Sequence, residues 1–185
     1  MENSDSSGLG NFSCGVTNHS RPRHPSEEGV NGIPEGDSFP WDARRRLTLE
    51  DAVAFHGHEG PWLIIGYRAG RRAVDILKPK TITDLHCIVK TPMNVPFTCA
   101  VDGIQVATRC TLGKLNIKLE KAESPEDIEY IFVCRRQGRT LRLKLKPDVW
   151  SKIEEIFSNA GITKASRWCE GQEFCRLFEE SLKET

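Results

Sequence analysis

Residues 56–77 read HGHEGPWLIIGYRAGRRAVDIL, and they join a glycine-rich corner to the clearest helical pattern in the chain. Gly57 and Gly60 leave the backbone free to turn, and Pro61 is suited to the first turn of a helix. After Pro61, small and apolar residues recur at intervals of three and four, which predicts a helix to the end of the stretch. A shorter helical pattern ends at Phe55, so the stretch predicts a helix-to-helix corner.

Two glycines, Gly66 and Gly70, lie one turn apart inside the predicted helix. Together they weaken helix propensity by about 2 kcal/mol. We interpret this as close packing against another backbone, or as a face left for a partner chain. The sequence therefore predicts a homodimer; the alternative is that the helix packs entirely on the sheet of its own chain.

The corner carries two imidazoles, His56 and His58, separated by one residue. Side chains two residues apart diverge on a regular helix, but on a glycine-rich turn both can converge on one point. The pair is therefore a candidate metal or ligand site. The alternative is that both are ordinary turn histidines at a helix junction.

The remaining pattern predicts an α+β fold, with one antiparallel-rich sheet covered by helices on one face. Thr48 is a candidate N-cap, with Asp51 three residues later. The other elements are expected as strands over 85–90, 115–119, 130–135 and 140–146, and as helices over 100–108, 147–159 and 171–182.

Composition limits the possible classes of protein. The 185 residues include 26 basic and 26 acidic side chains, which argues against nucleic acid as a partner. The sequence lacks a run of apolar residues long enough for a membrane span, and its start lacks the apolar core of a secretory signal, so we expect a cytoplasmic protein. Residues 1–40 are expected to form a flexible tail. Residues 41–185 form the domain, with a helical extension from about residue 147.

Seven cysteines occur without any CxxC pair, so neither a disulfide framework nor a structural zinc site with paired spacing is expected. Cys99 falls at a predicted helix N-terminus, where the dipole favours a thiolate; the alternative is a small buried hydrophobe. Cys110 lies about 16 Å further along a continuous helix and can share a metal only if the chain doubles back. The four remaining cysteines are not expected to be ligands: Cys14, Cys134, Cys169 and Cys175.

Four motifs, in this order, resemble the FmdE family of formylmethanofuran dehydrogenase proteins. They read FHGH at 55–58, GYRAG at 66–70, CAVDGIQ at 99–105 and CTLGKLN at 110–116. The resemblance covers about residues 47–146 and leaves the C-terminal helices outside it. It implies a domain similar to the sheet-bearing domain of glyceraldehyde-phosphate dehydrogenase, with a helix-strand-helix unit followed by three strands in a mixed sheet.

The resemblance also implies a metal site built from His56, His58 and Cys99, with Cys110 as a lower-ranked candidate ligand. Many relatives carry a cysteine before the proline of the corner, whereas this chain has Glu59-Gly60 there. The zinc-ribbon module of some members is also missing. Zinc is the metal that mixed imidazole and thiolate ligands favour.

Three functions remain open. The first is a zinc-binding accessory protein of a molybdenum or tungsten formylmethanofuran dehydrogenase-type system, which implies that enzyme complex as a possible partner. The second is a stand-alone zinc enzyme with an open metal position, in which Glu59 or Asp102 would be the general base. The third is a metal-free dimeric interaction module.

Overall fold

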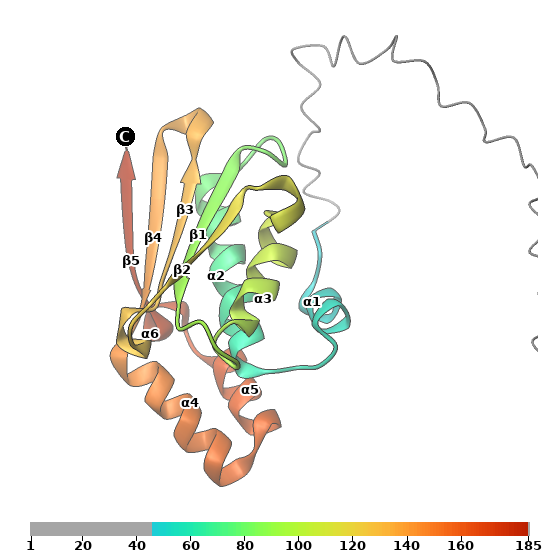
Figure 1. Cartoon of the computed structure of the whole chain (residues 1–185), viewed down its shortest axis with the longest axis vertical. Coiled ribbons are helices and arrows are strands. Elements are labelled where there is room, and N and C mark those ends of the chain that lie inside the picture. Colours follow the sequence, from blue (N-terminus) through green and yellow to red (C-terminus); the bar gives the residue numbers. More distant parts are fainter. Residues whose placement is uncertain (1–45, 185) are drawn as a thin grey trace, which may run out of the picture. The chain divides into compact units, whose positions relative to one another are not determined.

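The structure is a computed structural model that describes residues 46–184. The elements follow one another as two helices, a strand, a helix, three strands, three helices and a last strand (Figure 1). Their bounds are α1 Leu49–His56, α2 Pro61–Leu77, β1 Leu85–Thr91, α3 Cys99–Thr108, β2 Ile117–Lys121, β3 Glu129–Cys134, β4 Arg139–Leu145, α4 Pro147–Ala160, α5 Ile162–Gly171, α6 Phe174–Leu177 and β5 Phe178–Glu184.

The five strands form one mixed sheet in the order β2-β1-β3-β4-β5. β1 and β2 are parallel, with Cys87 opposite Ile117, and the other neighbours are antiparallel. A parallel pair needs a crossover connection, and α3 supplies it. The predicted α+β class, and the helix-strand-helix unit followed by strands of a mixed sheet, are therefore confirmed.

The core lies between the sheet and the helices α2 and α3, which cover one face of it (Figure 1). Along β4, Leu141, Leu143 and Leu145 are buried while the residues between them are more exposed. This alternation places one apolar face of the strand on the core, as the sequence pattern predicts.

Helices α2 and α3 approach each other closely because glycines replace side chains at their contact. A Cβ on Gly66 would lie 1.9 Å from the carbonyl oxygen of Ala100, and one on Gly103 would lie 2.2 Å from that of Leu63. A Cβ on Gly70 would lie 2.7 Å from that of Ala107. The expected close packing against another backbone is confirmed, and α3 covers the face that a partner chain was expected to use.

The C-terminal segment differs from the expectation. The helix predicted over 171–182 is wrong: only Phe174–Leu177 is helical, and Phe178–Glu184 forms the edge strand β5. Without β5, the outer edge of β4 would leave its backbone groups unpaired, and seven residue pairs from Arg139–Glu184 to Leu145–Phe178 fill that edge. Pairing across the sheet therefore outweighs the local helical spacing of the apolar residues.

The strand expected from Leu115 begins two residues later, at Ile117. Leu115 has φ of 53°, in the left-handed region, and its side chain is 87% exposed. A residue in that conformation cannot continue a strand, so the turn before β2 ends there.

Two expectations concern the ends and surroundings of the domain. The predicted tail, residues 1–40, and Cys14 within it lie outside the described residues. Among the described residues, no helix is both long and apolar enough to cross a membrane.

Candidate functional site

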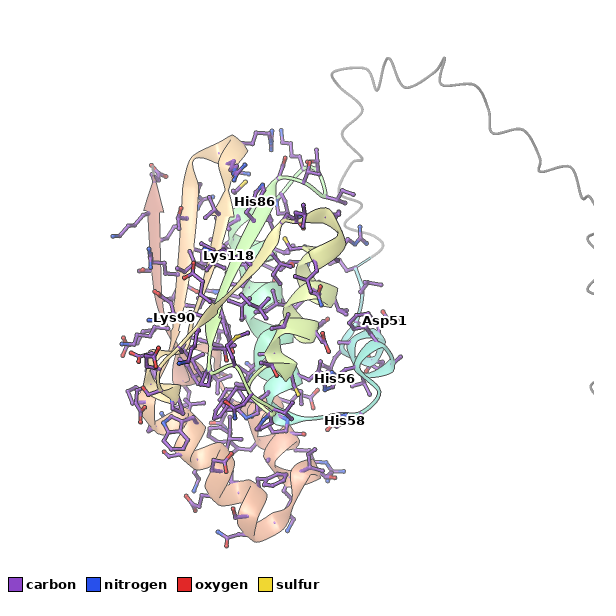
Figure 2. The ribbon with its side chains drawn as sticks, viewed as in Figure 1. Asp51, His56, His58, His86, Lys90 and Lys118 are labelled. Carbon is purple, nitrogen blue, oxygen red and sulfur yellow. The ribbon has the colours of Figure 1, made fainter. Side chains whose placement is uncertain are left out.

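The corner between α1 and α2 positions the two histidines. Thr48 and Asp51 form a reciprocal capping box at the start of α1, as the sequence predicts. Gly57, with φ of 96°, ends α1 directly after His56. The imidazole centroids of His56 and His58 lie 4.7 Å apart at an interplanar angle of 37°. The corner therefore brings both rings together (Figure 2).

His56 is held by a carboxylate from the first turn of α3. Its Nδ1 lies 2.7 Å from Oδ2 of Asp102, and its side chain is only 11% exposed. The Gln105 amide donates to the other carboxylate oxygen at 3.3 Å. Because a carboxylate only accepts hydrogen bonds, Nδ1 carries the hydrogen, and Nε2 is the unprotonated nitrogen of the neutral ring.

His56 Nε2 is buried and has no hydrogen-bond partner among the described residues. Buried polar atoms without a partner are rare in folded proteins, and each needs an explanation. A histidine that ligates a metal through one nitrogen commonly donates its other N–H to a carboxylate. The His56–Asp102 pair has that arrangement, so the donor chemistry at this nitrogen fits a metal ion.

Cys99 is the first residue of α3 and is half-buried. Burial raises the pKa of its thiol, and the neighbouring Asp102 carboxylate raises it further; the backbone N–H at the helix start only partly offsets them. The expected thiolate at this helix N-terminus is therefore not favoured in the metal-free protein. Cys99 and His58 line the same cavity.

The predicted ligands are only partly brought together. The two imidazoles are adjacent, and Cys99 shares a cavity with one of them. Within residues 46–184, however, no group of three or more His, Cys, Asp and Glu side chains is arranged to hold a metal ion. The site thus offers adjacent imidazole donors rather than an assembled three-ligand set.

Cys110 is not part of this site. It follows the far end of α3 from Cys99, is fully buried, and its thiol donates to the carbonyl of Leu85 on β1 at 3.3 Å. The chain does not double back to bring Cys110 to Cys99, because Cys110 instead packs under the sheet.

The two candidate general bases have different surroundings. Asp102 is committed to His56 Nδ1 and therefore orients the ring. Glu59 is exposed on the corner itself. The sequence identified Asp102 as a chemically interesting residue but assigned it the wrong role, because its contact spans 46 residues of chain.

A cavity of about 380 Å³ adjoins the corner. The corner and α3 contribute His58 and Cys99 to its wall, and α4 and α5 contribute Phe157 and Ile162. Sequence reasoning missed these two residues. The available signal was a pair of large apolar side chains flanking Gly161, at the junction of two helices.

A mixed sheet with one helical layer, and a histidine corner clamped by a carboxylate from the crossover helix, define an α+β domain with one candidate ligand site. The family model described as "FmdE, Molybdenum formylmethanofuran dehydrogenase operon" matches residues 55–183. The chain belongs to this FmdE family. The match extends into β5, so the expectation that the C-terminal segment lies outside the family region is wrong.

A solved structure supports the fold. It is a crystal structure of an FmdE-like protein of tungsten formylmethanofuran dehydrogenase from Syntrophus aciditrophicus. The two chains are 18% identical, with a TM-score of 0.50, and the similarity covers 74% of this chain and 70% of that one. No curated protein matches this chain.

Proposed function

We propose that this protein is a zinc-binding accessory protein of a molybdenum or tungsten formylmethanofuran dehydrogenase-type system. The observation that carries the metal site is the buried, unpartnered Nε2 of His56, whose ring is oriented by Asp102. Metal binding would satisfy this nitrogen without disturbing the bond on the other side of the ring.

His56 and His58 would hold the ion, and Cys99 would approach it across the shared cavity after losing its proton. Imidazole and thiolate donors together favour zinc among the common divalent metals. A bound zinc ion would supply a Lewis acid at the edge of the cavity. The chain's own contribution is a fixed ring orientation, since Asp102 is in turn held by Gln105.

The accessory role rests on family membership. The family takes its description from the operon of the molybdenum enzyme, so we propose that enzyme complex as the partner. A cytoplasmic location is consistent with the described cysteines, all six of which are free thiols. We also retain a homodimer as a proposal, with its interface on a surface other than the Gly66 face that α3 covers. Light scattering at low micromolar concentration measures that mass directly.

A stand-alone zinc enzyme is the second candidate, favoured by the cavity next to His58 and Cys99. Catalytic zinc sites keep a position open for water or substrate, whereas structural sites are closed by four protein ligands. The absence of a preassembled third ligand within residues 46–184 is compatible with an open position.

Elemental analysis of the purified full-length protein tests the proposal. We expect one zinc per chain in the unaltered protein and less than one tenth of that in His56→Ala. His86→Ala is the matched control, because His86 is a half-buried histidine on β1 and lies apart from the corner (Figure 2). Equal zinc in His56→Ala and the unaltered protein, or equal loss in both variants, would overturn the assignment.

A further inference from the structure

The cavity beside the corner has a largely apolar wall built from separate parts of the chain. Trp62 comes from α2 and Pro96 from the loop before α3, and Ile153 and Phe157 come from α4. The Trp62 ring is held in place by Phe97, at 4.7 Å between centroids. A volume of about 380 Å³ lies within the range of small-molecule sites.

Three large apolar side chains stay exposed where they line this cavity. Val95 is 76% exposed, Phe157 48% and Ile162 38%. They belong to the loop before α3, to α4 and to α5, so the fold assembles them from three segments. Apolar side chains gathered at a cavity mark a surface that binding covers.

One carboxylate, Glu154 on α4, lines the cavity. It is half-buried and makes no hydrogen bond or ion pair with any residue in the described part of the chain. Its neighbour Glu155 is exposed and pairs with Lys152 at 2.9 Å. Adjacent glutamates therefore differ: Glu155 has a surface partner, whereas Glu154 faces an apolar cavity without one.

We propose that this cavity binds a small molecule with a flat apolar body and a single protonated amine. The flat body would lie against Trp62 and Phe157, because aromatic walls favour planar groups. The ammonium group would pair with Glu154, since a carboxylate next to apolar surface gains most from a directly bonded cation. This inference goes beyond the proposed function, because it requires no metal at His56.

Calorimetry with two matched probes tests the ligand class. The probes are 2-naphthylmethylamine and its neutral analogue 2-naphthylmethanol, titrated into the full-length protein as purified and after chelator treatment. We expect one amine bound per chain, about tenfold more tightly than the alcohol. Glu154→Gln removes this preference, and Glu155→Gln retains it.

A second pair of variants tests the location. Ile162→Trp fills the cavity and should weaken both probes at least about tenfold, since the added ring occupies the space of the flat body. Leu182→Trp is the control, because Leu182 is 44% exposed on β5, away from the cavity. Circular dichroism confirms that each variant is folded.

Several results would overturn the inference: no binding of the amine, equal binding of amine and alcohol, the same loss in Glu155→Gln, or full binding in Ile162→Trp. The chelator-treated sample separates this test from the zinc proposal. Amine binding there stands whether or not the untreated protein carries zinc.

Discussion

Replacing Gly66 by alanine tests the close contact between α2 and α3. The new Cβ would lie 1.9 Å from the carbonyl oxygen of Ala100 and 2.6 Å from its carbonyl carbon. These are backbone atoms of a packed helix, so no side-chain rotation relieves the clash, and the helices must separate by more than 1 Å to reach ordinary contact, about 3.5 Å for carbon.

Two effects of the substitution oppose each other. Alanine improves helix propensity by up to about 1 kcal/mol, whereas overpacking a rigid contact costs about 3 kcal/mol or more. The steric term is larger, so we expect a net loss of about 2 kcal/mol in the free energy of unfolding. For a chain of this size, that corresponds to a fall of about 4–8 °C in Tm.

Urea denaturation followed by circular dichroism measures this loss, with Gly171→Ala as the matched control. Gly171 is also in a helix, but a Cβ there would meet nothing within 4 Å. We expect that control to be neutral or slightly stabilised. If Gly66→Ala were as stable as Gly171→Ala, the account of the helix contact would be refuted.

Two further predictions concern polar contacts that tie distant segments. Burial raises the pKa of Asp84, but hydrogen bonds from Thr81, the Lys80 amide and Arg136 outweigh this and lower it. The stabilisation lost in Asp84→Asn, about 1–2 kcal/mol, should thus be fully present above the unfolded pKa of about 3.9 and disappear as pH falls through the lower folded value; a loss independent of pH would contradict this. Arg68 donates to three backbone carbonyls at the end of α5, so Arg68→Ala should lower stability by about 2 kcal/mol in urea titrations, and an effect no larger than that of Arg71→Ala would refute the role.

Local patterns were sufficient for most elements of the domain. The corner, the capping box at Thr48 and the alternation along β4 follow from residues close together in the sequence. The segment from Phe178 was misassigned because its strand exists only through pairing with β4, more than 30 residues earlier. A one-dimensional pattern does not contain that partner.

The candidate site was predictable to a similar extent. Its histidines are conspicuous because the glycines around them exclude regular helix. The role of Asp102 was not predictable, since its bond to His56 depends on how α3 crosses α1. Cys110 was misplaced for a related reason: spacing along a helix gives its direction but not whether the chain then turns toward the sheet.

The most direct test of the metal assignment is a crystal structure of the protein grown with zinc, with an anomalous-difference map recorded at the zinc edge. We predict a peak at about 2.0–2.1 Å from His56 Nε2, with Nδ1 still bonded to Asp102. A peak elsewhere, or an ordered water or protein group bonded to Nε2 in place of zinc, would contradict the account.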